Sequence, residues 1–230
     1  MRLSIIIPAY NEEATITRTI ERVKAVSLPG VDKEIIVIDD ASRDNTAQIL
    51  QKLQDIKVVS HKVNQGKGSA VKSGLLEATG DVVLIQDADL EYDPGEYPRL
   101  LAPIQAGFAD VVYGSRFMGG GPHRVYYLHH YFANRFLTVL SNLFSGIYLS
   151  DMETCYKVFT KDVVDSFKNK LKSRRFGIEP ELTARVAKGN WRVYEVGISY
   201  HGRTYNEGKK INWKDGLAAI WHIVYFNILD

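Results

Sequence analysis

The chain has 230 residues, of which 45% are hydrophobic and 24% are charged, and its formal net charge is +2. This is the composition of a globular domain with a full core, and a net charge so close to zero argues against a protein that binds nucleic acid. A single cysteine, Cys155, excludes an internal disulfide framework and favours a reducing compartment. The apolar run at residues 3–7 is too short for a signal peptide, and the longest uncharged run, 136–150, is shorter than the ~20 residues of a membrane-spanning helix. The chain is therefore not expected to cross a membrane by itself.

Short apolar runs rich in β-branched residues alternate with amphipathic segments along the first half of the chain. Strands are predicted over residues 3–7, where Pro8 ends the run, and over residues 34–38, 56–60, 82–85 and 110–113. Helices between them are predicted from apolar residues at helical spacing, namely Ile16, Ile20 and Val23, then Ala47, Leu50 and Leu53, then Val71, Leu75 and Ala78. Asn11 is expected to cap the first helix, and Pro94 to lie in the first turn of a later one. This alternation predicts an α/β fold with a mostly parallel sheet.

The second half of the chain differs in composition and no longer shows the regular alternation of strands and helices. Residues 125–149 are aromatic and leucine-rich and are expected to be helical, as are residues 180–187. Strands are expected over residues 156–160 and 191–200, and residues 217–229 are apolar nearly all round. The sequence shows no linker and no repeat, which favours one domain with a C-terminal elaboration.

Two carboxylates follow the predicted strand at residues 82–85. Asp87 and Asp89 are spaced i, i+2, and in extended backbone such side chains point to the same side. They would converge at the carboxyl end of a strand, where open α/β sheets bind ligands. Two hard oxygen donors there suit Mg²⁺ or Mn²⁺ shared with a substrate phosphate. The alternative is a polar turn, because Asp is common after strands.

Other polar and aromatic residues follow the first two strands of the same sheet edge. Tyr10 offers a ring for a nucleobase, and the carboxylates of Asp39 and Asp40 can accept hydrogen bonds from a base or a ribose. The alternative for each, taken singly, is a helix cap or a turn.

A glycine-rich loop at residues 64–68 invites comparison with the known phosphate loops. The Walker pattern is not met, and Val71 stands where the third glycine of a dinucleotide fingerprint would be. The remaining prediction is a loop at a helix N-terminus where Lys67 contacts an anion.

Four motifs in this order resemble the family-two glycosyltransferases of the GT-A fold: Pro-Ala-Tyr-Asn-Glu at 8–12, Ile-Asp-Asp-Ala-Ser-Arg-Asp-Asn-Thr at 38–46, Asn-Gln-Gly-Lys-Gly at 64–68 and Asp-Ala-Asp-Leu at 87–90. The turn at 114–116 and the stretch at 203–209 resemble the dolichyl-phosphate mannosyltransferase and polyprenyl-phosphate glycosyltransferase branch. The resemblance implies a Rossmann-like, mostly parallel central sheet flanked by helices, with a C-terminal helical elaboration. Residues 1–211 would be the transferase domain, with a nucleotide-sugar-binding half at 1–116 and an acceptor half at 117–211. Residues 212–230 would be an apolar helix of the same domain or of the membrane interface.

The resemblance also implies roles for individual residues. The nucleoside of a nucleotide sugar would be held by Pro8, Tyr10, Glu12, Ile38 and Asp40. Asp87, Ala88 and Asp89 would form the Asp-X-Asp motif that binds Mg²⁺ or Mn²⁺, with Glu91 as a further metal ligand where this branch often has Gln. Phosphates would be contacted by Arg116, Arg203 and Lys209, and Arg124 is placed among the substrate contacts.

The reaction implied is inverting transfer of a hexose from a nucleotide sugar, of the GDP-mannose or UDP-glucose type, to polyprenyl or dolichyl phosphate. A divalent cation would offset the charge that develops on the leaving nucleoside diphosphate. A phosphate monoester, with a second pKa near ~6, is already anionic at pH 7, so the acceptor needs steering by cations more than it needs a general base. Asp89, Arg116 and Asp151 are expected to carry catalysis.

Three other functions are weighed against this one. A transferase that attacks a sugar hydroxyl group in polysaccharide synthesis would need a carboxylate base, for which Asp151 is the candidate. A degenerate fold that serves only as a membrane-associated partner is opposed by the intact carboxylates of Asp87 and Asp89. A sugar-1-phosphate nucleotidyltransferase is disfavoured because its N-terminal glycine-rich signature is missing. Residues 154–157 read Thr-Cys-Tyr-Lys where the branch often has Ser-Gly-Phe-Arg, so the sugar and the lipid are left open.

A lipid acceptor requires an apolar surface, and two stretches could provide it. Residues 125–149 and 217–229 are expected to lie in the bilayer interface. Anionic headgroups would be attracted by a basic segment consisting of Lys168, Lys170, Lys172, Arg174 and Arg175. The alternatives are core or dimer helices and a solvated loop, so a homo-oligomer is left open. The expected location is cytoplasmic, peripheral on the inner face of the cell membrane.

Overall fold

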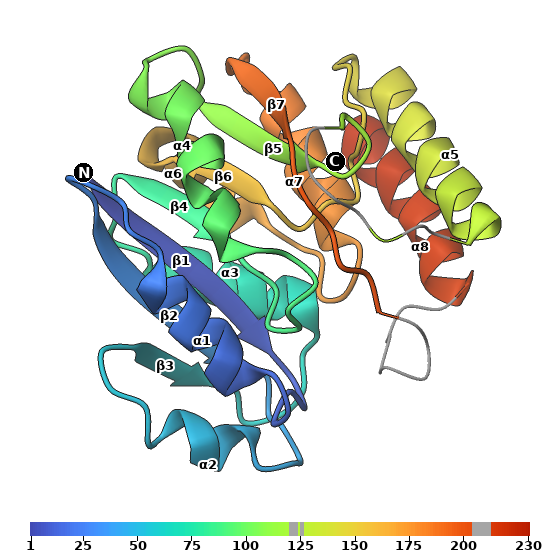
Figure 1. The fold of residues 1–230 in the computed structure, drawn as a ribbon. Helices are drawn as coiled ribbons and strands as arrows, with labels where there is room; N and C mark the ends of the chain where they lie inside the picture. The colour runs from blue at the N-terminus through green and yellow to red at the C-terminus, as the bar shows by residue number, and fades with distance from the viewer. Residues whose placement is uncertain (120–123, 125–126, 204–212) are drawn as a thin grey trace.

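The structure is a computed structural model that describes residues 1–119, 124, 127–203 and 213–230 (Figure 1). A seven-stranded sheet runs through it in the spatial order β3-β2-β1-β4-β6-β5-β7. The strands are β1 (Arg2–Ala9), β2 (Asp32–Asp39), β3 (Lys57–Ser60), β4 (Val82–Ile85), β5 (Val111–Ser115), β6 (Lys157–Thr160) and β7 (Val193–Gly197). All strand pairs are parallel except those of β6, so the predicted α/β class and mostly parallel sheet are confirmed.

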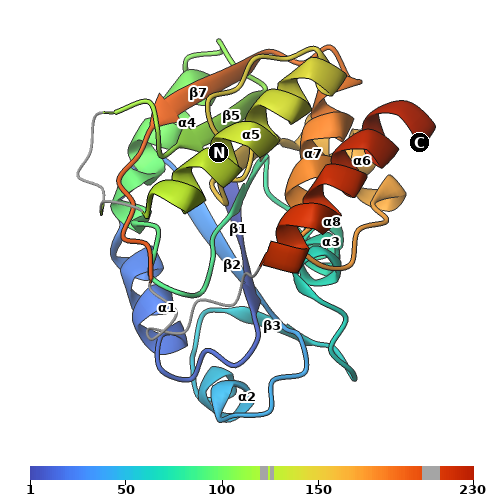
Figure 2. The same ribbon diagram turned by 90° about the vertical axis from the view of Figure 1, so that its right-hand side faces the viewer.

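Helices cover both faces of the sheet. They are α1 (Ile16–Ala25), α2 (Thr46–Leu50), α3 (Lys67–Glu77), α4 (Tyr97–Gln105), α5 (Leu128–Ser145), α6 (Lys161–Phe167), α7 (Ile178–Ala187) and α8 (Trp213–Val224). Figure 2 shows α1 and α4 on one face and α3, α6 and α7 on the other. Helices α5 and α8 pack side by side and against α7 (Figure 1). A 3₁₀ turn at Pro94–Glu96 precedes α4, as expected for Pro94, and one π-helical turn, Tyr225–Leu229, extends α8.

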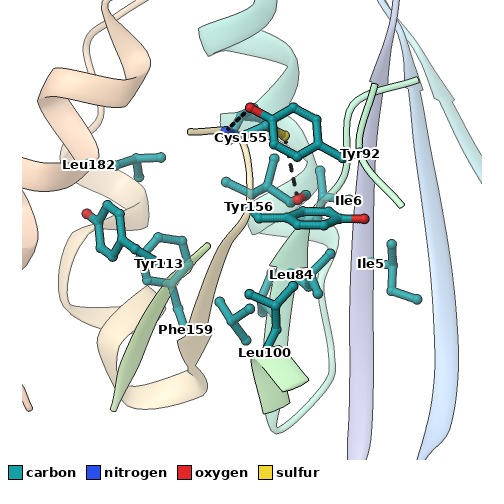
Figure 3. Close-up of a cluster of buried hydrophobic side chains, with 14 of the residues drawn as sticks. Ile5, Ile6, Leu84, Tyr92, Leu100, Tyr113, Cys155, Tyr156, Phe159 and Leu182 are labelled. Atoms are coloured by element: carbon teal, nitrogen blue, oxygen red, sulfur yellow. Dashed lines mark hydrogen bonds between the residues drawn. The ribbon is translucent and has the colours of Figure 1, made fainter. Parts of the chain in front are cut away.

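The core lies between the central strands and the helices that cover them. Ile5 in β1 pairs in parallel register with Leu84 in β4, and both are fully buried. Strands covered on both faces read as continuous apolar runs, which is why 3–7 and 82–85 show no alternation. Figure 3 shows these side chains packed with Leu100 from α4 and Tyr156. Each fully buried aliphatic side chain of this kind contributes ~1.5–3 kcal/mol.

The prediction that Pro8 ends the first strand is wrong, because β1 continues through Pro8 to Ala9. The amide of Gln86 donates to the carbonyl of Ile6, so the even-numbered residues of β1 face β4. The last β1–β4 pair is Ile6 with Ile85, so no backbone hydrogen bond to β4 is required from residue 8, and proline can stand there without loss. On the other side, Pro8 stays in register with Ile38 of β2.

The prediction that Asn11 caps the first helix is also wrong. Helix α1 begins at Ile16, and Asn11 has a left-handed φ of 51°. The Asn11 side chain instead accepts a hydrogen bond from the Arg43 amide at 2.8 Å. It therefore joins the two loops that follow β1 and β2.

Strand β6 is inserted antiparallel between β4 and β5. Lys157, at the start of β6, pairs with Tyr113 near the carboxyl end of β5, and Val158 pairs with Leu84 near the end of β4. The segment that enters β6, residues 151–156, therefore lies at the same sheet edge as the residues that follow β4. This placement brings acidic side chains from distant parts of the sequence to that edge.

The packing of α3 on β1 gives a stability prediction. A Cβ on Gly74 would lie 2.3 Å from Ile6 Cγ2, whereas a Cβ on Gly216 in α8 would meet no atom within 4 Å. We expect Gly74→Ala to lower the free energy of unfolding by about 1–3 kcal/mol through overpacking. Gly216→Ala is the matched control and should raise it by about 0.5–1 kcal/mol through helix propensity. Urea denaturation measures both, and stabilisation by Gly74→Ala would show that α3 does not pack on β1 this closely.

Candidate active site

The loop after β4, residues 87–91, carries Asp87, Asp89 and Glu91 and is called the acidic loop. Buried polar groups fix its backbone. Gln86 is fully buried, and its Oε1 accepts hydrogen bonds from the hydroxyls of Tyr97 and Tyr156, each at 2.7 Å. Its Nε2 donates to the Asp87 carbonyl at 3.0 Å. The Thr19 hydroxyl donates to the carbonyl of buried Ala88 at 2.9 Å. These bonds fix the backbone that carries the two predicted metal ligands.

Asp87 faces a cation from the glycine loop. The Nζ of Lys67, the first residue of α3, lies 2.9 Å from Asp87 Oδ1 and 3.0 Å from Glu179 Oε1. Burial alone would lower the pKa of Lys67, but these two carboxylates raise it well above its usual value. Lys67 is therefore at the predicted place, with its charge held between two carboxylates.

The glycine of this loop is required by a close approach of another segment. Gly66 has φ 93°, and a Cβ on it would lie 2.4 Å from the carbonyl oxygen of Arg174. The Ser69 amide donates to that same carbonyl at 3.1 Å. The loop is thus packed directly on the basic segment 168–175.

Asp89 faces a second cation. The Nη2 of Arg203 donates to Asp89 Oδ2 at 2.8 Å, its Nε donates to Glu91 Oε1 at 3.3 Å, and its Nη1 lies 3.8 Å from Glu12 Oε2. Burial, together with the carboxylates of Asp87 and Glu91, raises the pKa of Asp89 to about 7 despite this ion pair. One guanidinium thus sits among three carboxylates.

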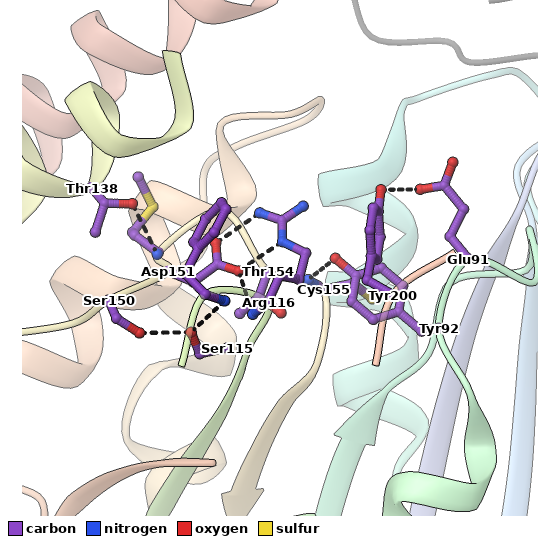
Figure 4. Close-up of polar contacts among 12 residues, drawn as sticks. Glu91, Tyr92, Ser115, Arg116, Thr138, Ser150, Asp151, Thr154, Cys155 and Tyr200 are labelled. Atoms are coloured by element: carbon purple, nitrogen blue, oxygen red, sulfur yellow. Dashed lines mark hydrogen bonds and ion pairs between the residues drawn. The ribbon is translucent and has the colours of Figure 1, made fainter. Parts of the chain in front are cut away.

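Glu91 ties the segment after β7 to the acidic loop. The Tyr200 hydroxyl donates to Glu91 Oε2, the Arg203 amide donates to Oε1 at 2.9 Å, and the His201 amide donates to the Glu91 carbonyl at 2.9 Å. Figure 4 shows Glu91 and Tyr200 joined in this way. The observed bonds of Glu91 position Arg203, while its predicted role as a metal ligand stays a prediction.

The predicted nucleoside residues meet at the ends of β1 and β2. Pro8 pairs with Ile38, and Asp39, the last residue of β2, is buried with its Oδ1 accepting from the Ser42 amide at 3.2 Å. Tyr10 directly follows β1 and is partly exposed. The predicted meeting of these loops at one edge is confirmed, and their contacts to a nucleoside stay a prediction.

Asp40 braces the glycine loop. Its Oδ1 accepts from the Gln65 amide at 2.9 Å and its Oδ2 from the Gly66 amide at 2.7 Å. His61 Nδ1 lies 2.7 Å from Asp40 Oδ1, and His61 Nε2 lies 2.9 Å from the Ser73 hydroxyl. Both oxygens of this buried carboxylate are therefore bound within the chain.

Arg116 and Asp151 form a buried bidentate ion pair (Figure 4). The Nε of Arg116 donates to Asp151 Oδ2 and its Nη2 to Oδ1, both at 2.7 Å, and the Arg116 amide also donates to Oδ2 at 3.0 Å. The guanidinium carbon lies 5.2 Å from the centre of the Tyr200 ring. Asp151 is fully buried and Arg116 is 8% exposed. Asp151 thus has its oxygens bound to the cation that it positions.

One further predicted substrate contact, Arg124, lies near the segment after β7. The Arg124 amide donates to the Tyr200 carbonyl and its Nη1 to the Gly202 carbonyl, both at 3.0 Å. Lys209 lies outside the described residues. Arg124 and Arg203 thus flank one short stretch of backbone.

The sequence predictions missed Glu179, Glu153 and Tyr200. Glu179 reaches the site from the first turn of α7, and Glu153 from the segment before β6. The acidic pair at residues 179 and 181 was the available signal, but it is equally typical of a helix N-terminus.

The carboxylate edge fits a divalent cation. Its donors are hard oxygens, and the three carboxylates of Asp89, Glu91 and Glu12 share a single guanidinium there. Within the residues that the structure describes, no three His, Cys, Asp or Glu side chains are grouped to hold a metal ion alone.

Two comparisons place the chain among known proteins. It matches the glycosyl transferase family 2 model over residues 4–167. The dolichol-phosphate mannosyltransferase of Pyrococcus furiosus is 40% identical over 124 residues, which are 53% of this chain and 35% of that protein. The low-salt glycan biosynthesis hexosyltransferase Agl6 of Haloferax volcanii is 30% identical over 232 residues, covering 99% of this chain and 53% of that protein. The chain thus spans about a third and about half of the lengths of these two relatives.

Solved structures agree on the fold. Glucosyl-3-phosphoglycerate synthase from Mycobacterium tuberculosis, in complex with phosphoglyceric acid, matches with a TM-score of 0.74 at 22% identity, covering 98% of this chain and 79% of that one. The same enzyme in complex with Mn²⁺, UDP and glucosyl-3-phosphoglycerate gives a TM-score of 0.72 at 21% identity, with coverage of 98% and 79%. These likenesses confirm the expected GT-A fold. With the family model matching most of its length, this chain belongs to glycosyl transferase family 2.

Proposed function

We propose that this chain transfers a hexose from a nucleotide sugar to polyprenyl or dolichyl phosphate, with inversion at the anomeric carbon. The observation that carries the proposal is the Arg116–Asp151 pair. Asp151, the carboxylate expected to act as base on a hydroxyl acceptor, has its oxygens bound to Arg116. An acceptor that arrives already ionised needs no such base and is attracted by cations. The relative named dolichol-phosphate mannosyltransferase supports this acceptor class.

A Mg²⁺ or Mn²⁺ ion is part of the proposal. Asp87 and Asp89 would hold it together with the diphosphate of the donor, and Glu91 stays a candidate third ligand. When bound, the ion would offset the charge that develops on the departing nucleoside diphosphate. Structures of the mycobacterial synthase with Mn²⁺ and UDP, and with Mg²⁺ and UDP, support this choice of ions and of donor class.

The chain's own residues would divide the remaining work. The loops that begin at Tyr10 and directly after Asp39 would hold the nucleoside, and Ala88 would lie against the donor through its backbone. Arg203 and Lys209 are the proposed phosphate contacts, and Arg124 is a further proposed substrate contact. Arg116, positioned by Asp151, would contact the phosphate of the acceptor. The expected division into a nucleotide-sugar half, 1–116, and an acceptor half, 117–211, stays part of the proposal.

The proposal is tested by ligand screening followed by transfer. Nucleoside diphosphates with Mn²⁺ should raise the melting temperature, because a ligand bound to the native state stabilises it. The best nucleotide then selects labelled sugar donors, and label should move into the organic phase only when polyprenyl phosphate is present.

Metal binding should depend on pH in a defined direction. Since burial with Asp87 and Glu91 raises the pKa of Asp89 to about 7, that carboxyl is mostly protonated below this pH. A cation binds the ionised form, so the apparent Mn²⁺ affinity should be level above pH 7 and fall about tenfold per pH unit below it. Mn²⁺ titration followed by paramagnetic resonance measures this. A Mn²⁺ affinity that does not change between pH 5.5 and 8 would show that Asp89 is not a ligand of the ion.

A transferase acting on a sugar hydroxyl is the second candidate, and one observation favours it. Glu153 lies in the segment before β6, and in the described structure its Oε1 is buried with no hydrogen-bond partner. Burial and the carboxylate of Glu179 raise the pKa of Glu153 to about 7, which suits a general base at neutral pH.

We further propose that the chain binds the inner, cytoplasmic face of the cell membrane through α5 and α8. Exposed apolar side chains line α5, namely Leu128, Phe132, Phe136, Val139 and Leu143. Leu217, Trp221, Ile228 and Leu229 are exposed on α8 and the turn after it. In the basic segment, Lys170, Lys172, Arg174 and Arg175 are exposed. None of the described helices is long and apolar enough to span a bilayer.

Liposome binding tests this surface. The wild type should sediment with vesicles of anionic lipid, less so as salt rises, because the attraction of basic residues is screened. Replacing both Phe136 and Leu143 by Ser should weaken sedimentation about tenfold or more, since each loses the burial of a large side chain. Phe108→Ser, which changes an equally exposed phenylalanine between α4 and β5, is the control and should have no effect. If the protein binds none of the lipid mixtures at low salt and is a dimer in solution, the exposed face of α5 would be an interface with a second copy of the chain instead.

A further inference from the structure

Several buried polar atoms beside the proposed donor site have no partner. Among the described residues, the buried side-chain oxygens without a hydrogen bond include Glu153 Oε1, Thr154 Oγ1 and Glu179 Oε2. Glu179 is 6% exposed and Thr154 is fully buried. Buried polar groups in native proteins are nearly always bonded, so these three oxygens call for a missing hydrogen-bond partner.

Lys67 connects Glu179, which carries one of these oxygens, to Asp87 in the acidic loop. The other oxygen of Glu179, Oε1, is 3.0 Å from Lys67 Nζ, which is itself 2.9 Å from Asp87 Oδ1. Glu153 interacts electrostatically with Glu179 and Lys157, and the Nζ of Lys157 donates to the carbonyl of Thr154. A group attached to a diphosphate at Asp87 would contact them by extending past Lys67.

The chemistry of the cluster selects the kind of ligand. Carboxylate oxygens accept hydrogen bonds and repel a phosphate, so an anion is excluded. A bound cation is opposed by the ammonium group of Lys67, which already lies against Glu179. A neutral ligand with several hydroxyl donors satisfies every orphaned oxygen, and a hexose is such a ligand.

We propose that Glu179, with Glu153 and Thr154, binds the hydroxyl groups of the donor's hexose and so decides which hexose is accepted. This inference rests on the proposed function for the identity of the donor. It assigns the sugar-selecting role to residues that the sequence motifs did not include.

The test compares the affinity for a nucleotide sugar with that for its nucleoside diphosphate, by calorimetry with Mn²⁺. Glu179→Gln and Thr154→Val should each weaken binding of the nucleotide sugar, by about ten- to a hundredfold for the charged acceptor. Thr154→Val should leave nucleoside diphosphate affinity within about twofold. Glu179→Gln should weaken nucleoside diphosphate binding clearly less than nucleotide sugar binding, because the Oε1 of Glu179 also contacts Lys67. Ser141→Ala is the matched control, since it also removes a buried oxygen without a partner, but from α5. It should change neither affinity.

A second measurement uses two donors that share a nucleotide and differ in one sugar hydroxyl. The wild-type preference between them, measured as the ratio of kcat/KM values, should fall toward one in Glu179→Gln. Equal weakening of nucleotide sugar and nucleoside diphosphate would mean that Glu179 acts only through Lys67 and Asp87, and would overturn the inference. Unchanged sugar affinity in both variants would overturn it as well. If the wild type binds no nucleoside diphosphate with Mn²⁺, the proposed function itself fails and the inference falls with it.

Discussion

Asp89→Ala should fold normally and lose nearly all sugar transfer, with kcat reduced by at least about a thousandfold. Removing a single group that stabilises developing charge costs ~10²–10³ in kcat, and Asp89 would also hold the cation that does so. The fold should survive, because Arg203 keeps its contacts to Glu91 and Glu12. The measurement is transfer of labelled sugar at saturating Mn²⁺, with a melting curve to confirm folding.

Two controls make this result specific. Asp162→Ala removes an exposed carboxylate from the first turn of α6 and should retain wild-type activity. Excess EDTA should silence the wild type, and added Mn²⁺ should restore it. Full activity in EDTA, or in Asp89→Ala, would contradict a cation held at the acidic loop.

The acidic loop could be predicted from the sequence because its geometry is local. A buried strand that runs into carboxylates at i and i+2 places both at the carboxyl end, whatever the rest of the chain does. The glycine loop was located for the same reason, since Gly66 stands directly before α3. What the sequence did not reveal is that Lys67 joins Asp87 to Glu179, a residue more than ninety positions away along the chain.

The partners of the catalytic candidates depend on topology instead. Arg116 meets Asp151 because β6 returns antiparallel between β4 and β5, and no short pattern distinguishes this insertion from another parallel strand. The cap predicted at Asn11 failed for a similar reason, since a long-range bond to Arg43 competes with the local one. Local propensity predicts such residues only where no distant partner outweighs it.

The last prediction concerns the nucleophile, and it separates the two enzyme functions. Asp151→Asn should slow transfer to polyprenyl phosphate by about ten- to a hundredfold, mainly through a higher KM for the acceptor. Asparagine is neutral and has a single acceptor oxygen, so the bidentate pair with Nε and Nη2 of Arg116 is lost, and with it the charge partner of the guanidinium. Breaking a buried ion pair costs ~3–5 kcal/mol of stability, so a lower melting temperature is expected with it.

A general base has a different signature, which Glu153→Gln examines. With a lipid phosphate as acceptor, the nucleophile is ionised before it arrives, so this variant should keep the pH profile of the wild type even where sugar binding is weaker. With a hydroxyl acceptor, the carboxyl whose pKa is about 7 would take the proton during attack. At saturating Mn²⁺, where metal binding to Asp89 no longer limits the rate, Glu153→Gln would then lose a factor of ~10²–10⁴ in kcat, together with the rise in rate through pH 7. With a lipid phosphate acceptor, label should be recovered in an organic-phase product that mild acid cleaves. Label in a water-soluble oligosaccharide instead would show that the acceptor is a hydroxyl group and would contradict the proposed transfer to a lipid phosphate.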